Sequence, residues 1–180
     1  MGKRSFFPRL ALVNLVRNSR YYGPYLLSCG ALAAMYYILR FLTWNEVIQT
    51  VRGAAYLQVM MSIGCFVVAL FSIVLLLYAN SFVMKRRQKE LGLYNILGLE
   101  KRHIAALCFW EMLLCAAVVI PGGIAAGILL SKLILLLLLK LVQIPVQFGF
   151  SVSVRGVGET AALLGVLFLL ALLWNLLRLG

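Results

Sequence analysis

GAAYLQVMMSIGCFVVALFSIVLLLYANSFVM, the sequence of residues 53–84, contains no charged side chain, and it ends at the basic stretch KRRQKE of residues 85–90. An α-helix needs about 20 mostly apolar residues to cross the hydrocarbon core of a bilayer. The uncharged run therefore predicts a membrane-spanning helix. Because it exceeds this requirement by roughly half, we expect the helix to tilt strongly or to project beyond the membrane.

The composition of the whole chain agrees with a membrane location. It is 64% hydrophobic and 12% charged, whereas ordinary soluble domains are roughly 45 to 50% apolar and about 25% charged. Each unsatisfied backbone group in lipid is costly, so only helices and closed barrels span membranes. Long unbroken apolar runs differ from the alternating pattern of barrel strands. The chain is therefore predicted to be an all-α integral membrane protein.

Four apolar runs predict four transmembrane helices, at about residues 21–40, 54–84, 104–131 and 160–177. The third run is the least regular. Pro121, Gly122 and Gly123 interrupt it, and apolar residues continue past Ser131 as far as Lys140. A straight helix over 104–140 would be about 55 Å long, so we expect it to bend or break at Pro121 or near Ser131.

Residues 1–20 are expected to form a separate amphipathic helix at the cytoplasmic membrane surface, ahead of a four-helix transmembrane domain at 21–180. The segment 5–20 is too polar to span. Wound as a helix, it places four apolar residues on one side, namely Ala11, Leu12, Leu15 and Val16. The other side is polar and contains Asn14, Arg17 and Asn18. This pattern is typical of a helix that lies flat on the bilayer.

The distribution of Lys and Arg predicts the orientation, because basic residues collect on the cytoplasmic side. With four spans, both termini and the central loop share one side of the membrane. That side holds 12 of the 17 basic residues: Lys3, Arg4, Arg9, Arg17, Arg20, Lys85, Arg86, Arg87, Lys89, Lys101, Arg102 and Arg178. We therefore expect a multi-pass membrane protein with both termini in the cytoplasm.

Several function classes are disfavoured. The net charge of +12 does not indicate nucleic-acid binding, because the basic residues flank spans and form no single soluble face; anionic lipids are the expected partner. There is no Asp, no P-loop and no metal-ligand spacing, so no enzyme activity, cofactor or metal is expected. The four cysteines lie in predicted spans and are expected to be buried, namely Cys29, Cys65, Cys108 and Cys115.

Residues 26–30 read LLSCG, which loosely resembles a lipoprotein cleavage site. The apolar stretch between Arg20 and Cys29 is short and contains Pro24. We therefore expect no cleavage at Cys29.

Glu111 is the only acidic residue inside a predicted span. It lies about 10 Å along the helix from Ile104. Carboxylates within the membrane are costly and are candidates for function. The favoured interpretation is that Glu111 is hydrated near the cytoplasmic interface or paired with an arginine of the loop. The alternative is a proton or substrate role.

The loop between the second and third spans contains an apolar helical pattern. Leu93, Ile96 and Leu97 recur at i, i+3 and i+4, so a short helix would present them on one face. Gly98 follows where a C-terminal helix glycine is expected, and Gly92 would allow a close backbone approach. This face could receive a partner that pushes on both neighbouring spans, or it could rest on the bilayer. Composition alone does not decide between them.

Several motifs surround this loop: Tyr78-Ala79-Asn80-Ser81-Phe82, Lys85-Arg86-Arg87, the stretch 90–104, Phe109-Trp110-Glu111 and, near the N-terminus, Asn14, Arg17-Asn18 and Tyr22-Gly23-Pro24-Tyr25. Together they resemble the FtsX-like permeases, in particular the bacitracin-export type permeases of antimicrobial-peptide resistance ABC transporters in Gram-positive bacteria. The resemblance extends over the whole chain.

The resemblance implies a partner and a mechanism. Such permeases work with a separate cytoplasmic ABC ATPase, which pushes on the loop helix, here Glu90, Gly92, Leu93, Ile96, Leu97 and Gly98. By mechanotransmission they free lipid-bound cell-wall intermediates from peptide antibiotics on the outer side. Many also associate with a sensor histidine kinase.

The chain also departs from the family pattern. Complete permeases have a second four-span half and a large extracellular domain, so this chain resembles an N-terminal half. It is expected to be a truncated gene product, a fragment or one piece of a split permease, with a second half or a further copy as partner. The alternative functions are a non-transporting interaction or signalling partner of a sensor kinase complex, and an ion-coupled transporter that uses Glu111.

Overall fold

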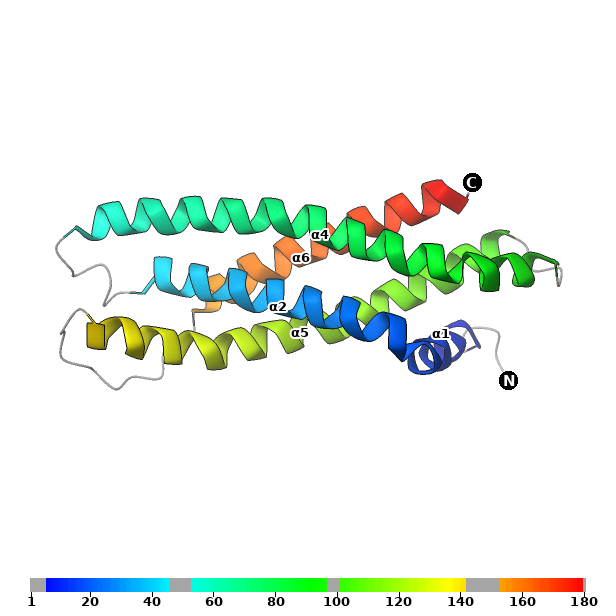
Figure 1. Cartoon of the computed structure of the whole chain (residues 1–180), viewed down its shortest axis with the longest axis horizontal. Helices are drawn as coiled ribbons and strands as arrows, with labels where there is room; N and C mark the ends of the chain where they lie inside the picture. Colours follow the sequence, from blue (N-terminus) through cyan, green and yellow to red (C-terminus); the bar gives the residue numbers. More distant parts are fainter. Residues whose placement is uncertain (1–5, 46–52, 97–100, 142–152, 180) are drawn as a thin grey trace.

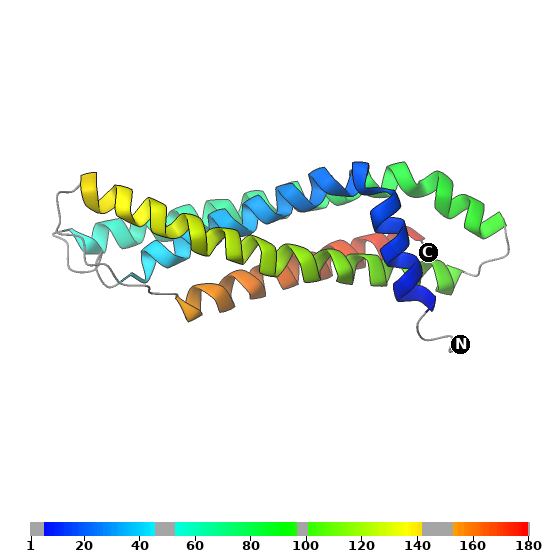
Figure 2. The same ribbon diagram turned by 90° about the horizontal axis from the view of Figure 1, so that it is seen from below.

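The computed structural model describes residues 6–45, 53–96, 101–141 and 153–179. These form five helices: α1 (Phe6–Arg17), α2 (Ser19–Thr43), α4 (Ala54–Ile96), α5 (Lys101–Leu141) and α6 (Val154–Leu179). Figure 1 shows α2, α4, α5 and α6 running lengthwise as one elongated bundle, and Figure 2 shows α1 lying across one end of it. Four of the helices are long and apolar enough to cross a membrane, which confirms the all-α membrane fold.

The helix of the second span is longer than a bilayer core requires, at about 64 Å; whether it tilts or projects stays a prediction. α4 is a single helix of 43 residues that continues from Ala54 through the basic stretch to Ile96. The sequence predicted a short helix between the second and third spans, and this prediction was wrong in that the helix is not separate from the second span. Within the described residues, the segment 85–96 forms the last turns of α4.

Of the bend or break expected in the third span, the break does not occur. α5 is one helix of 41 residues with Pro121 inside it. Proline is tolerated in membrane helices because neighbouring groups satisfy the backbone carbonyl that loses its partner. At the second expected break, Ser131 is buried within the helix and its hydroxyl donates to the carbonyl of Ile128 at 2.9 Å. A local hydrogen bond of this kind is compatible with an unbroken helix.

The fourth helix begins earlier than expected, at Val154 and not near Thr160. Ser153 precedes it and acts as an N-cap, because the backbone N–H of Gly156 donates to the Ser153 hydroxyl at 3.1 Å. Serine is among the favoured N-cap residues. Gly156 and Gly158 lie inside the first turns of α6.

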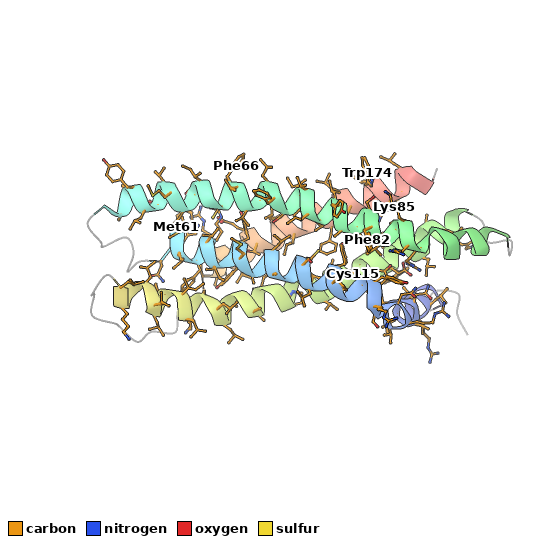
Figure 3. All side chains as sticks on the ribbon, in the orientation of Figure 1. Met61, Phe66, Phe82, Lys85, Cys115 and Trp174 are labelled. Atoms are coloured by element: carbon orange, nitrogen blue, oxygen red, sulfur yellow. The ribbon has the colours of Figure 1, made fainter. Side chains whose placement is uncertain are left out.

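The core lies where α2 packs between the other helices. Its largest cluster combines side chains from four helices: Tyr22, Tyr25 and Cys29 of α2, Leu76 and Val83 of α4, Met112, Cys115 and Val119 of α5, and Leu167, Phe168 and Ala171 of α6. All four cysteines are buried and free, which confirms their expected packing role. Figure 3 shows Cys115 among these side chains.

Helices α2 and α5 approach most closely at two glycines. A Cβ atom built on Gly123 would lie 2.4 Å from the Cβ of Ala33, and one on Gly127 would lie 3.0 Å from Tyr37. Small residues at a crossing let two backbones pack tightly in a membrane, where van der Waals contact is a main source of helix association. No such approach occurs at Gly92, where a Cβ would meet nothing within 4 Å among the described residues. The close backbone approach expected at Gly92 therefore stays a prediction.

Candidate functional site

A buried ion pair joins α4 to α5 near the end of the bundle that holds α1. The guanidinium of Arg87 contacts the carboxylate of Glu111 through Nη1 and Oε2. Arg87 is 2% exposed and Glu111 is 3% exposed, so both charges are withdrawn from solvent and lipid. Elsewhere α4 and α5 approach each other little, and they are among the least closely packed neighbours in the bundle. The ion pair is therefore the main described link between these two helices.

Two polar side chains from α1 and α2 complete the ion pair. The hydroxyl of Tyr22 accepts a hydrogen bond from Arg87 Nη1 at 2.8 Å and lies 3.4 Å from Glu111 Oε2, to which it donates. The amide nitrogen of Asn14 donates to Glu111 Oε1 at 3.3 Å. Both carboxylate oxygens thus have donors. Four helices meet at one charged group, and we refer to Asn14, Tyr22, Arg87 and Glu111 as the inner polar cluster.

Helical geometry selects Arg87 from the basic run. Lys85 and Arg86 are exposed, and the Arg86 guanidinium lies 5.3 Å from the ring centroid of Phe82 on the outer side of α4. Arg87 comes one residue later, about 100° further round the helix axis, and points into the bundle. A basic run that ends a span thus supplies two surface charges and one buried charge.

A second polar contact lies two turns earlier on the same face of α4. The side chains of Asn80 and Asn175 form two reciprocal amide hydrogen bonds, at 2.8 and 3.1 Å, and both residues are buried. They link α4 to α6. Since Asn80 and Arg87 are separated by about 10 Å along α4, this helix is held at two points, one on α6 and one on α5 and α2.

The energetics of the ion pair point to a role beyond stability. Desolvating two charges costs several kcal/mol per ion, and replacing a buried pair by apolar residues is often neutral or stabilising. Ionisable residues inside membrane segments are usually functional and paired. A buried pair that joins otherwise loosely packed helices is suited to holding them in register.

The opposite end of the bundle carries a more exposed ionic contact. Arg40 of α2 lies 2.7 Å from the Glu159 carboxylate of α6, and Arg155 lies 3.3 Å from the other oxygen of the same group. The Arg155 guanidinium stacks 3.8 Å from the ring centroid of Trp44. These contacts join α2 and α6 at that end of the bundle. Being partly exposed, they are expected to contribute about 1 kcal/mol or less each.

The residues singled out in the sequence fall into two groups. Glu111 is paired with Arg87, a residue of the predicted loop. Pairing with a loop arginine was one part of the favoured interpretation of Glu111. Gly92 is exposed, and Glu90, Leu93 and Ile96 lie on the last turns of α4, but the surroundings of these three side chains are outside the described part. Leu97 and Gly98 lie outside the described residues altogether. Their assignment to partner binding stays a prediction.

Sequence reasoning missed most of the inner polar cluster. Asn14 had been placed with the polar side of the N-terminal helix, yet it is 1% exposed. The seven-residue spacing of Asn80 and Arg87 was the available signal for an inward polar face on α4. No group of three His, Cys, Asp or Glu side chains that could hold a metal occurs within the described ranges.

Comparisons with known proteins fit this arrangement. A family model described as FtsX-like permease C-terminal matches residues 62–180. The chain is 30% identical over 171 residues to the bacitracin export permease protein BceB of Bacillus subtilis strain 168, covering 93% of this chain and 26% of that protein. It is 28% identical over 172 residues to BceB of Halalkalibacterium halodurans, with 93% and 26% covered.

A third relative is the uncharacterized ABC transporter permease YvcS of Bacillus subtilis strain 168. It is 25% identical over 171 residues, which cover 94% of this chain and 26% of YvcS. The chain thus spans about a quarter of the length of the curated relatives it matches.

Proposed function

Because the chain belongs to the FtsX-like permease family, we propose that it is the membrane part of an ABC transporter permease that transmits motion from a separate ATPase into its bundle. The observation that supports this proposal is the course of α4. This helix runs without a break from the membrane to Ile96, and Arg87 attaches it to Glu111 where it enters the bundle.

The proposed mechanism follows from these attachments. The ATPase binds the face formed by Leu93, Ile96 and Leu97 and displaces the projecting end of α4. Since α4 is one rigid helix, its displacement reaches Arg87 and is passed to Glu111 on α5 and to Tyr22 on α2. The Asn80–Asn175 contact carries the same displacement to α6. Movement at one membrane face thereby changes the packing of all four spans.

The orientation and substrate class are part of the proposal. We place both termini and the α4–α5 connection in the cytoplasm of a bacterial cell, because basic residues are concentrated on that side. Figure 1 shows α1, the projecting end of α4 and the last turns of α6 at one end of the bundle, which is compatible with this orientation. The names of two relatives refer to bacitracin export, and we extend a role in resistance to such peptide antibiotics to this chain.

Further partners are proposed on the same basis. A second permease half or a further copy would complete the transmembrane assembly, anionic lipids would neutralise the basic side, and a sensor histidine kinase would couple transport to signalling. An ion-coupled mechanism through Glu111 is not favoured, because this carboxylate is already paired with Arg87 and hydrogen-bonded by two further side chains.

Co-purification with a candidate ABC ATPase of the same organism tests the coupling surface. Replacing Leu93 and Leu97 by Asp should abolish association, since two charges would be forced into an apolar contact. Leu91→Asp with Tyr94→Asp is the matched control, because residues 91 and 94 are spaced i and i+3, share a different side of the helix and would receive the same added charge. Association that survives Leu93→Asp/Leu97→Asp, or that is lost equally in the control, would contradict the proposed binding face.

A further inference from the structure

One face of α1 is covered by none of the other described helices. Leu12, Val13 and Val16 on this face are 53%, 53% and 68% exposed. Arg9 and Arg17 are exposed beside them, because positions i, i+3, i+4, i+7 and i+8 share one side of a helix. We call these five residues the outer face of α1. Three large apolar side chains bounded by two arginines form an amphipathic surface.

The opposite face of α1 contacts the inner polar cluster. Ala11 and Asn14 are almost fully buried, and α1 packs mainly on α5. Through the hydrogen bond from Asn14 to Glu111, the position of α1 affects the donors available to the Glu111 carboxylate. The helix thus has one side on the ion pair and one side open.

The orientation of α1 indicates what its open side meets. Figure 2 shows α1 lying across the long direction of the bundle, so it would lie roughly parallel to a membrane that the other four helices cross. Interfacial helices in this position bury their apolar side chains about 5 to 10 Å into the headgroup and acyl boundary. Arg20, Lys85 and Arg86 are exposed at the same end of the bundle, where they add positive charge.

We propose that the outer face of α1 binds an anionic phospholipid surface, and that this contact holds Asn14 against Glu111. The apolar side chains enter the lipid, and Arg9 and Arg17 bind lipid phosphates. The membrane surface thereby becomes a fixed support for the inner polar cluster. The inference uses the transmembrane arrangement of the proposed function but not the ATPase contact. Loss of ATPase binding and loss of lipid binding are therefore separate outcomes.

Fluorescence quenching in lipid nanodiscs tests the position of the outer face. A polarity-sensitive probe is attached at Val16→Cys in the full chain, with Leu70→Cys, an exposed position in the middle of the α4 span, as the control. Spin-labelled lipids with a nitroxide near the headgroup should quench the probe at residue 16 most strongly. Those with a deep nitroxide should quench the probe at residue 70.

Two results would overturn the proposal. Quenching of the residue 16 probe by aqueous iodide but not by lipid would place the outer face in water. Protection from both quenchers would indicate a protein contact, such as a second copy of the chain.

Hydrogen exchange tests the charge requirement. Amides of α1 in nanodiscs containing phosphatidylglycerol should exchange more slowly than in phosphatidylcholine alone, by about fivefold for each arginine that binds a phosphate. Arg9→Gln/Arg17→Gln should remove this difference, whereas Arg155→Gln at the opposite end should leave it unchanged. Equal exchange of the wild-type α1 in both lipids would refute the anionic-lipid contact.

Discussion

Removing one charge of the Arg87–Glu111 pair should destabilise the protein far more than removing both. In Glu111→Gln, the guanidinium of Arg87 stays buried at 2% exposure with no anion beside it. In Arg87→Met, the Glu111 carboxylate keeps only the hydrogen bonds from Tyr22 and Asn14. An uncompensated buried charge costs about 3 to 5 kcal/mol, so each single variant should lose about that much free energy of unfolding.

The double variant Arg87→Met/Glu111→Gln contains no buried charge at this site. Methionine fills much of the space of the arginine stem, and the amide oxygen introduced at position 111 can still accept a hydrogen bond from Tyr22 or Asn14. The expected cost is about 1 kcal/mol, the usual net value of one altered hydrogen bond. The interaction energy between the two sites should therefore be about 5 kcal/mol or more, because the two single losses of at least about 3 kcal/mol each are replaced by one loss of about 1 kcal/mol.

Equilibrium unfolding of the full chain in mixed detergent–lipid bicelles would measure these free energies. Arg155→Met is the control, because Arg155 belongs to the exposed ionic contact and should cost about 1 kcal/mol or less. Single variants that each lose less than about 1 kcal/mol, or a double variant that loses the sum of the two, would refute the assignment of a buried, mutually dependent pair.

Two further predictions concern packing and the second polar contact. Gly123→Ala should destabilise the bundle by about 1 to 3 kcal/mol, because its Cβ would lie 2.4 Å from that of Ala33; Gly122→Ala, with nothing within 4 Å, should be neutral or stabilising in the same unfolding assay. Asn80→Leu should cost about 1 to 2 kcal/mol, because it leaves the buried Asn175 amide unpaired. Asn80→Leu/Asn175→Leu should recover part of this loss, and a double variant worse than the single would contradict the reciprocal contact.

The spans were predictable because their signal is additive along the chain. Uninterrupted apolar length determines whether a helix can cross a bilayer, and no knowledge of its neighbours is needed. Helix ends and interruptions were less predictable. Pro121 does not end α5, because surrounding helices and lipid favour a continuous helix over exposed backbone groups. The start of α6 depended on one serine hydroxyl at Ser153, which a search for apolar runs does not detect.

The members of the inner polar cluster could not be identified in the same way. Choosing Arg87 over Lys85 or Arg86 requires the rotational setting of α4 against α2 and α5, and that setting results from packing across the whole bundle. Glu111 was found because an acid within a span is rare in any context. Its partners Asn14 and Tyr22 are ordinary residues whose importance depends on where the helices meet.

For α1, the assignment of polar and apolar sides was misleading for a physical reason. In water, an amphipathic helix places apolar residues against the protein core. In the placement of α1 that we propose, on a membrane surface, lipid competes with the core for apolar side chains such as the exposed Val16. Asn14 is buried, and its amide donates a hydrogen bond to the Glu111 carboxylate.

The stronger of the two polar contacts on α4 lies where the proposed mechanism places the larger force. In the proposed mechanism, force is applied near Ile96, about 14 Å beyond Arg87, and Asn80 lies about 10 Å on the other side of Arg87. For a rigid rod held at two points, a sideways force at the free end is balanced by a reaction of about 2.3 times that force at Arg87 and about 1.3 times at Asn80.

The larger reaction force falls on the charged pair of Arg87 and Glu111, which is the stronger class of contact. The point of smaller load carries a neutral amide pair. An ATPase acting on α4 would thus meet most resistance where α4, α5, α2 and α1 are joined, so that these helices move together and the helix is not pulled out of register.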